Sequence, residues 1–381
     1  MEEQGRLVGE VQALGERIAG REAADPDRYP AETIGELIGL GVLSAPLPVR
    51  LGGRGVSLAE AAAIVEAVAE ASPSAALLAS MPIGLAGVLA GAGPIVPEAH
   101  RAAFNEQVAR VAADYGAGKI YAACNSEKGA GGSIAATKTI ARRGAGGDHR
   151  ITGEKILGSF GRHADVFFST AKVPEGGVEF FLIDAGAPGV QIGCDWDGFG
   201  MRSTESHSVR FEDAQARDLL GFPGFIEGAQ PLSWWWCLFA AIPLGCAASM
   251  LRALGEPAPS SPALRLRLAE ALMRYEAARA YLLDTAARFR PGADPAYRAR
   301  VTRTKTHVTQ EATRICADLF ALSGGRHYTR SGRLSRTLSD AFAGTALRPP
   351  LPLALDMLLD DFSLGDLAEG SARIAPGQRR S

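Results

Sequence analysis

The chain has few cysteines and few histidines, and its positive and negative charges nearly cancel. It has 381 residues but only five cysteines, an odd number, and none stands in a Cys-x-x-Cys pair. Neither a disulfide framework nor a cysteine metal site is therefore expected, and the chain suits the reducing cytoplasm. The net charge of -2 offers no basic surface for nucleic acid. No spacing of His, Asp and Glu is typical of a metal centre, so we expect no metal.

Targeting and membrane segments are not expected either. The acidic start, Met1-Glu2-Glu3, lacks the basic and apolar regions of a signal peptide. Two stretches, 74–97 and 234–251, are uncharged and approach the roughly 18–20 residues that cross a bilayer. Neither has the flanking Lys/Arg asymmetry of a membrane span. Because a helix that is apolar on all sides also occurs in the core of a large bundle, we predict core helices and no membrane association.

The residue pattern along the chain changes twice, from helical to strand-rich and back to helical. This pattern predicts three domains. Residues 1–118 show helical spacing, and Ser57 with Glu60 forms a capping-box pattern before the apolar run 57–71. Residues 119–226 hold β-branched and aromatic runs that are bounded by Gly and Pro. Residues 227–381 return to long amphipathic patterns and end in a polar tail that we expect to fray. The fold class is therefore predicted to be α+β.

Four motifs stand in a fixed order along the chain. They are Cys124-Asn125-Ser126-Glu127-Lys128-Gly129-Ala130-Gly131-Gly132-Ser133, Gly153-Glu154-Lys155-Ile156-Leu157-Gly158-Ser159-Phe160-Gly161, Phe199-Gly200-Met201-Arg202-Ser203-Thr204 and Ser323-Gly324-Gly325-Arg326-His327-Tyr328. The first motif alone reads as a plain hairpin turn, since glycines allow tight turns or a close backbone approach to a ligand. The combination of all four is far more specific than any one of them.

Together these motifs resemble the acyl-CoA dehydrogenase family over roughly residues 5–350. The resemblance implies an N-terminal helical domain, a central small β barrel and a C-terminal four-helix bundle. It also implies a flavin cofactor, FAD or FMN, and assembly into a homodimer or homotetramer. In this alignment Ser126 and Ser159 replace two family threonines that bond the flavin ring. The full set of implied cofactor contacts is Cys124, Ser126, Gly131, Gly132, Ser133, Leu157, Ser159, Phe160, Gly324 and Gly325.

The chain departs from the family where the catalytic glutamate should stand. The aligned position falls near Arg348, and the alternative family position falls at Trp234-Trp235-Trp236. Neither side chain can act as the carboxylate base that removes a weakly acidic C–H proton. The nearby carboxylates, Asp340, Asp356 and Asp360, have no family precedent as the base. The turn 253–262, which in FAD-binding members reaches the pyrophosphate, is proline-rich and acidic here, which favours FMN or a loosely held reduced flavin.

Both departures recur in a branch of the family that resembles dibenzothiophene monooxygenase and uses reduced flavin. The favoured function is therefore oxygenation of an aromatic or apolar small molecule in secondary metabolism, with a flavin reductase as a second partner. Candidate catalytic residues are Ser159, His163, His327 and Arg348, and candidate substrate-pocket residues are Trp235, Trp236, Phe239 and Tyr328. The three adjacent tryptophans also suit a bundle core or a subunit interface.

Two other functions stay open at this point. The first is an unusual dehydrogenase of an acyl-CoA or carrier-bound thioester, with a displaced base. The second is a catalytically inactive homologue that acts as a binding subunit.

Overall fold

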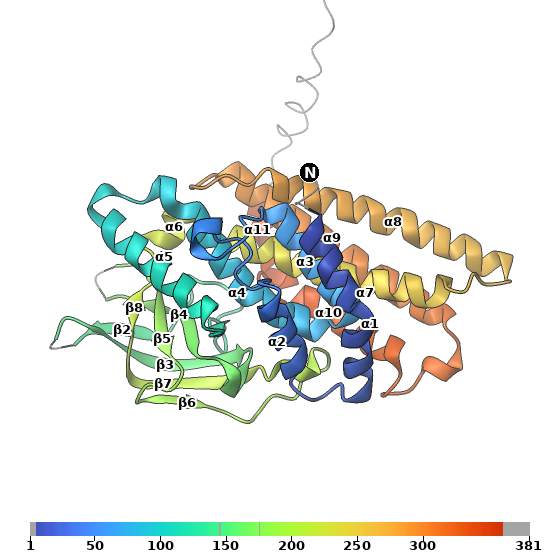
Figure 1. Cartoon of the computed structure of the whole chain (residues 1–381), viewed down its shortest axis with the longest axis horizontal. Helices are drawn as coiled ribbons and strands as arrows, with labels where there is room; N and C mark the ends of the chain where they lie inside the picture. The colour runs from blue at the N-terminus through green and yellow to red at the C-terminus, as the bar shows by residue number, and fades with distance from the viewer. Residues whose placement is uncertain (1–4, 145, 175, 361–381) are drawn as a thin grey trace, which may run out of the picture.

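The computed structural model describes residues 5–144, 146–174 and 176–360 (Figure 1). The predictions for Met1-Glu2-Glu3 and for the tail beyond Asp360 lie outside these ranges. The secondary structure falls into three successive blocks, which are helical, strand-rich and helical. The first boundary lies between Gly116 and Tyr121, and the second lies at Phe225. The predicted helical, β and helical architecture is confirmed.

Among the described residues, five α-helices form the N-terminal block and six form the C-terminal block. The first five are α1 (Arg6–Ala24), α2 (Ala31–Gly39), α3 (Leu58–Ala71), α4 (Pro73–Ala92) and α5 (Arg101–Gly116). The others are α6 (Phe225–Ala229), α7 (Leu232–Gly255), α8 (Pro262–Ala287), α9 (Pro295–Leu322), α10 (Arg333–Ala346) and α11 (Leu351–Asp360). The predicted capping box is present: Ser57 N donates to Glu60 Oε2 at 2.8 Å, and the Ser57 hydroxyl accepts from Glu60 N.

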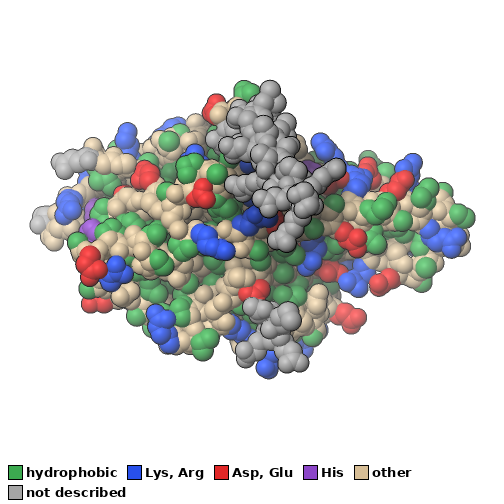
Figure 2. Space-filling view, turned by 90° about the horizontal axis from the view of Figure 1, so that it is seen from above, with side chains coloured by type: hydrophobic (Ala, Val, Ile, Leu, Met, Phe, Trp, Pro, Cys, Tyr) green, Lys and Arg blue, Asp and Glu red, His purple; other side chains and the backbone are tan. Residues whose placement is uncertain are grey.

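Helix α7 lies at the centre of the molecule, packed against α3, α4, α8, α9 and α10. The segments Pro73–Ile95 and Leu232–Gly255 are long and apolar enough to cross a membrane, but 89% and 72% of their most apolar parts are buried inside the protein. The prediction of core helices is confirmed by this burial. Basic and acidic side chains are interspersed over the outer face that Figure 2 shows, where α8 projects to one side.

The central block is a single curled sheet that stands beside the helices (Figure 1). Its strands are β1 (Tyr121–Ala123), β2 (Ile140–Arg143), β3 (His149–Gly158), β4 (Val166–Lys172), β5 (Val178–Asp184), β6 (Val190–Ile192), β7 (His207–Gln215) and β8 (Asp218–Leu219). The order is β6-β7-β3-β2-β4-β5-β8, and β1 pairs in parallel with β4. Among the described residues, no strand pairing joins β6 to β8, which are the two ends of the sheet. The predicted barrel is therefore open.

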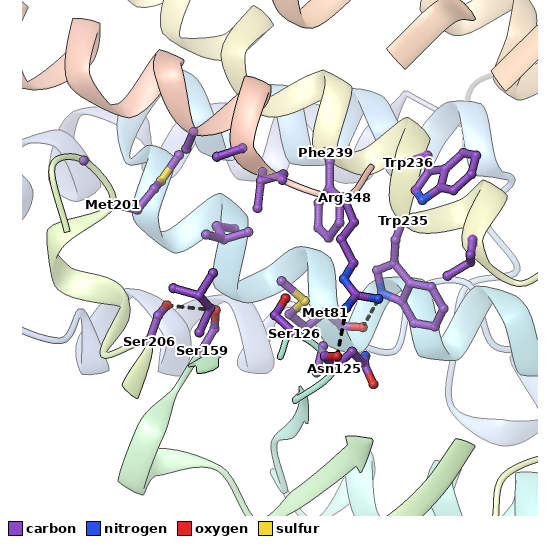
Figure 3. A pocket seen from close by; sticks show the side chains of 18 of the residues that line it. Met81, Asn125, Ser126, Ser159, Met201, Ser206, Trp235, Trp236, Phe239 and Arg348 are labelled. Carbon is purple, nitrogen blue, oxygen red and sulfur yellow. Dashed lines mark hydrogen bonds between the residues drawn. The ribbon is translucent and has the colours of Figure 1, made fainter. Parts of the chain in front are cut away.

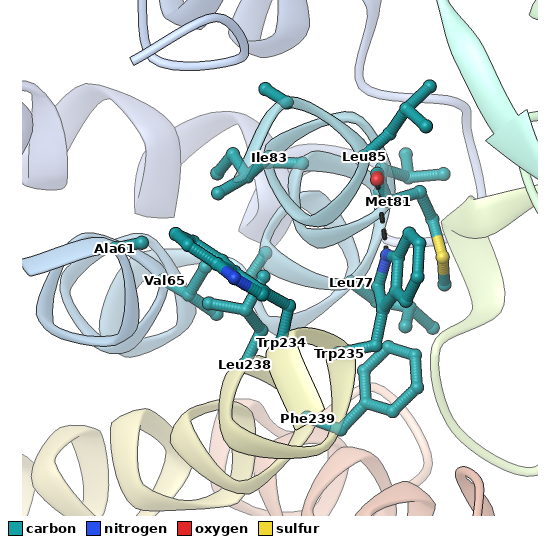
Figure 4. Packing of buried hydrophobic residues seen from close by; sticks show 14 of the residues in the cluster. Ala61, Val65, Leu77, Met81, Ile83, Leu85, Trp234, Trp235, Leu238 and Phe239 are labelled. Carbon is teal, nitrogen blue, oxygen red and sulfur yellow. Dashed lines mark hydrogen bonds between the residues drawn. The ribbon is translucent and has the colours of Figure 1, made fainter. Parts of the chain in front are cut away.

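Trp234 and Trp235 lie against α4, where small residues make room for their rings (Figure 4). A Cβ at Gly84 would overlap the indole of Trp235, and a Cβ at Gly87 would overlap that of Trp234. Gly84 and Gly87 are three residues apart, so they lie on one face of α4. The Trp235 Nε1–H donates to Met81 O at 3.2 Å. These contacts hold Trp235 in one orientation, with its other ring face toward the sheet.

Candidate functional site

A cavity of about 400 Å³ lies where the sheet meets α4, α7 and α10. Aromatic and aliphatic side chains make most of its wall. Phe168 comes from β4, Phe180 from β5, and Trp235, Trp236 and Phe239 come from α7. The rings of Phe168 and Trp235 stack with their centroids 5.3 Å apart. A mostly apolar cavity with a few convergent polar groups is the usual form of a small-molecule site.

The polar groups of this wall are few and are concentrated at strand ends. Asn125 and Ser126 follow β1, Ser159 follows β3, and Ser206 precedes β7. One charged side chain, that of Arg348, joins them from the segment after α10 (Figure 3). Within the part of the chain that the structure describes, no Asp or Glu lines the cavity. The site therefore offers hydroxyls, an amide and a cation, but no carboxylate.

Ser159 stands in a sharp turn whose backbone is unusual. Its neighbours Leu157 and Phe160 have φ values of 60° and 71°, in the left-handed region that residues other than glycine seldom adopt. The pairing of β3 with β7 also shifts register between Lys155 and Gly158. Such strain costs about 1–3 kcal/mol per residue and persists only where surrounding structure imposes it. The turn aims the hydroxyl of Ser159 at the cavity instead of continuing the strand.

The Ser159 hydroxyl is the last member of a buried relay of three hydroxyls. Thr204 Oγ1 donates to Met201 O at 2.8 Å, and Ser206 Oγ lies 2.7 Å from Thr204 Oγ1. Ser159 Oγ lies 3.0 Å from Ser206 Oγ, as Figure 3 shows. Each hydroxyl carries a single proton. If the proton of Thr204 stays on the carbonyl, the arrangement that satisfies every bond has Ser206 donating to Thr204 and Ser159 donating to Ser206. Ser159 therefore presents only acceptor lone pairs to the cavity.

Arg348 reaches the cavity through a segment that is itself anchored. Its Nη2–H donates to Asn125 O at 2.8 Å, which ties the C-terminal helices to the loop after β1. Its Nε and Nη1 are buried and have no hydrogen-bond partner among the described residues. Burial lowers the pKa of Arg348 to about 10, and the charge of Glu127 opposes that shift. The side chain therefore stays cationic at neutral pH.

A buried ion pair supports the loop that carries Asn125 and Ser126. Glu127 Oε1 accepts from Lys155 Nζ at 2.6 Å, and both side chains are almost completely buried. Burial alone would raise the pKa of Glu127, but the hydrogen bond and charge of Lys155 outweigh it and hold the pKa below its usual value. This pair joins the first motif to the second. Glu127 is therefore a structural residue of the site and does not face its interior.

Several residues predicted from the sequence do meet at the cavity. Of the predicted cofactor contacts and catalytic residues, the structure places Ser126, Leu157, Ser159 and Arg348 in the wall. Of the predicted substrate-pocket residues, it places Trp235, Trp236 and Phe239 there. Trp234 points away, toward Gly87 of α4.

Other predicted contacts lie close to the cavity without lining it. Cys124 and Phe160 are buried in the core, and Gly132 packs against Pro350. Gly131 and Ser133 belong to the turns that follow Glu127, with Gly131 exposed. Neither residue is part of the cavity wall.

The two predicted catalytic histidines are not brought to the cavity. The ring of His163 stacks on Tyr29 at 3.7 Å, and its Nε2 faces Glu205 Oε2 at 3.5 Å. His327 follows Gly324 and Gly325 after α9, where its Nε2 accepts from Arg326 at 2.9 Å. Tyr328 is 82% exposed and is also outside the wall. A catalytic or pocket role for these residues has no support from the geometry of this chain.

The carboxylates near the missing glutamate are equally displaced. Asp356 and Asp360 are exposed on α11. Asp340 is buried, but its Oδ1 accepts from Met201 N at 2.6 Å, outside the cavity wall. Burial raises the pKa of Asp340 to about 7, against the opposing effect of that hydrogen bond.

Sequence reasoning missed a second group of wall residues. Phe168 and Phe180 belong to aromatic runs that read as sheet core, and Met81 belongs to an apolar helix without a visible face. Ser206 could have been found from its spacing to Thr204 in the third motif. Asn125 lies inside the first motif, next to Ser126.

Three family models match the chain and between them cover most of it. They describe the N-terminal domain of acyl-CoA dehydrogenase over residues 1–94, the middle domain over 122–214 and the C-terminal domain over 238–347. The chain belongs to the acyl-CoA dehydrogenase family. Members of this family are flavin-dependent oxidoreductases, but the reactions of its relatives differ.

Two curated relatives illustrate that range. Cyclohex-1-ene-1-carbonyl-CoA dehydrogenase of Syntrophus aciditrophicus is 25% identical over 363 residues, which covers 89% of this chain and 85% of the relative. L-evernosamine nitrososynthase of Micromonospora sp. is 28% identical over 375 residues, which covers 86% and 83%.

Among solved structures, FMN-bound TdsC from Paenibacillus sp. A11-2, a dibenzothiophene monooxygenase, superposes with a TM-score of 0.77 at 21% identity. The match covers 94% of this chain and 95% of TdsC. At that identity the likeness shows the fold alone.

Proposed function

We propose that this chain is a cytoplasmic, reduced-flavin-dependent monooxygenase acting on an aromatic small molecule. One observation carries the proposal: the wall of the cavity has aromatic side chains and an arginine at the position expected for the base, but no carboxylate among its described residues. A dehydrogenase of this family needs that carboxylate to remove the α-proton of its substrate. An oxygenase needs a dry pocket and hydrogen bonds to hold the reacting groups.

The residues of the cavity fit a flavin ring. A wide aromatic ring system needs apolar walls and a few hydrogen-bonding groups along its polar edge. Phe168, Phe180 and Trp235 supply such walls, and Ser126 and Ser159 supply hydroxyls on the sheet side. When bound in its reduced form, the flavin would supply two electrons to molecular oxygen, so that one oxygen atom enters the substrate and the other leaves as water. The acidic turn between α7 and α8 favours FMN over FAD.

The hydroxyl relay supports the reduced form of the cofactor. The relay leaves Ser159 with lone pairs only, so its best partner in the cavity is an N–H group. Reduced flavin carries an N–H at N5, where oxidised flavin has a bare acceptor nitrogen. A bare nitrogen facing the oxygen of Ser159 would have no hydrogen between the two acceptors. The chain is therefore proposed to hold reduced flavin more tightly than oxidised flavin, as an enzyme that receives its flavin from a reductase requires.

Flavin titration and oxygen mixing test the proposed function. The purified chain is expected to bind reduced FMN under anaerobic conditions, and the Ser126→Ala/Ser159→Ala double variant to bind it up to about tenfold more weakly per lost hydrogen bond. Protein-bound reduced FMN mixed with oxygenated buffer should regain its oxidised absorbance more slowly than free FMN, because the cavity excludes water. Absence of flavin binding would support the inactive-homologue alternative instead. Identical titrations of the wild type and the double variant would contradict the placement of the ring.

Thr204→Val is expected to weaken the preference for reduced flavin. Without the Thr204 hydroxyl, Ser206 loses its acceptor and can donate to Ser159, which frees the Ser159 proton for the cavity. One hydrogen bond is worth about 0.5–1.5 kcal/mol, so the midpoint potential of bound FMN should fall by roughly 10–30 mV. Spectroelectrochemical titration measures this shift. Thr302→Val, which removes a hydroxyl bonded to Arg298 O on α9, is the matched control. Equal potentials in wild type and Thr204→Val would refute the relay.

A further inference from the structure

Arg348 is a partly buried cation whose charge no described residue of the cavity wall balances. Its Nη2–H is satisfied by Asn125 O, but Nε and Nη1 are buried and have no partner within the described residues. These open donors lie on two edges of the guanidinium group. Leaving charged donors unsatisfied in an apolar site is costly, so such groups are normally paired. The structure thus contains a site that is complete only when an acceptor enters it.

The nearest carboxylate cannot serve as that acceptor. Glu127 raises the pKa of Arg348 through its charge, but its oxygens are already engaged. Oε1 accepts from Lys155 Nζ and from Thr139 Oγ1 at 2.8 Å, and Oε2 accepts from Lys138 N at 2.6 Å. Glu127 therefore stays on the sheet side of the loop. The missing negative charge has to come from whatever fills the cavity.

The guanidinium is held in place before any ligand arrives. Lys305 of α9, which is 2% exposed, donates to Leu347 O and Pro349 O, both at 2.7 Å, on either side of Arg348. It also donates to Gly344 O at 2.9 Å, at the end of α10. Three acceptors around one Nζ match the three N–H donors of the ammonium form, and they oppose the burial that lowers the pKa of Lys305 to about 7. With Asn125 O on its far side, Arg348 is fixed at both ends, and fixing a group in advance reduces the entropy that binding must overcome.

We propose that Arg348 binds a carboxylate of the substrate, so that the substrate is an aromatic acid. Trp236 and Phe239, which the flavin walls do not include, would take the aromatic part, and the guanidinium would take the acidic group. Arg348 lies with Asn125 and Trp235 on one side of the cavity, whereas Ser159 and Ser206 lie on the other (Figure 3). That separation leaves room for a cofactor edge at the hydroxyls and a substrate acid at the arginine. The inference rests on the proposed function at one point only, because it calls the acid that binds Arg348 a substrate.

The test compares three probes that share one ring system. The FMN-saturated protein is titrated calorimetrically with 2-naphthoate, 2-naphthamide and 2-naphthyl phosphate. Naphthoate is expected to bind at least about tenfold more tightly than naphthamide, which equals about 1.4 kcal/mol. Arg348→Gln should remove this difference, and Arg348→Lys should keep part of it, because lysine retains the charge without the planar fork. Equal binding of acid and amide by the wild type would overturn the proposal, and tighter binding of the phosphate would overturn the choice of carboxylate.

Two controls separate this inference from the proposed function. The same titrations are repeated without FMN, so that naphthoate and naphthamide can be compared even if FMN does not bind. A lack of FMN binding would refute only the proposed function. FMN affinity is measured in Arg348→Gln as well. A tenfold loss for FMN with an unchanged naphthoate-to-naphthamide ratio would assign the guanidinium to the cofactor and overturn the proposal. Arg326→Gln, an exposed arginine bonded to His327, should leave every affinity unchanged.

Discussion

Glu127→Gln is expected to lower the free energy of unfolding by about 3–5 kcal/mol, the typical cost of removing one partner of a buried ion pair. Lys155 is completely buried and its remaining partners are Thr170 O at 2.6 Å and Thr170 Oγ1 at 3.2 Å, which carry no negative charge. The new amide would also turn an NH₂ group toward donors, since Glu127 accepts from four groups. Urea denaturation measures the loss.

The surface pair of Arg210 and Glu212 provides the matched control. These side chains lie 2.9 Å apart but are 61% and 46% exposed, so Glu212→Gln should cost no more than about 1 kcal/mol. A Glu127→Gln variant that loses as little as this control would contradict the structural role assigned to the pair. Glu127→Leu/Lys155→Met should recover part of the stability, because it leaves no unpaired charge.

The pH dependence of stability follows from the same pair. The pKa of Glu127 is held below its unfolded value of about 4.3. Its contribution is therefore fully present above about pH 4.3 and is lost as the pH falls toward the folded pKa. Glu127→Gln should flatten this acid limb of the stability profile.

The fold could be predicted well because its signals are local or family-wide. The capping box of Ser57 and Glu60 depends on residues three apart, and the change from helical to alternating texture is visible over tens of residues. The sequence predicts that the membrane-like helices α4 and α7 belong to the core, because they are apolar on all sides and lack basic flanks. The open edges of the sheet depend on long-range pairing, which no local pattern reveals.

The site was predictable only where a motif ends in a constrained turn. Ser159 is predicted directly by the second motif. Arg348 is predicted by its alignment with the family position of the catalytic glutamate. The hydrogen bond from Ser159 to Ser206 joins residues 47 positions apart in the sequence, so only the structure reveals the relay. His163 sits next to the predicted turn, but the turn directs its ring to Tyr29 instead of the cavity. Sequence proximity to a motif does not say which side of a turn a side chain takes.

Straight-chain acyl-CoAs are expected to leave the bound flavin oxidised in the absence of oxygen. Hydride loss from the β-carbon requires removal of the α-proton, and α10 brings Ala343 and Ala346 to the wall where a carboxylate would be needed. Arg348 stays protonated at neutral pH and cannot accept that proton. General-base catalysis is typically worth 10²–10⁴-fold, so residual bleaching should be slower than in a true dehydrogenase by about that factor.

Anaerobic stopped-flow mixing of flavin-loaded protein with butyryl-CoA and octanoyl-CoA checks this rate. The Syntrophus dehydrogenase, mixed with the thioester for which it is named, is the positive control. Fast bleaching by this chain would favour the dehydrogenase alternative and would direct attention to Asp340, the buried carboxylate whose pKa burial raises to about 7. Asp340→Asn would then have to abolish the bleaching, whereas under the proposed oxygenase function the variant changes only the contact with Met201 N and leaves the slow rate as it was.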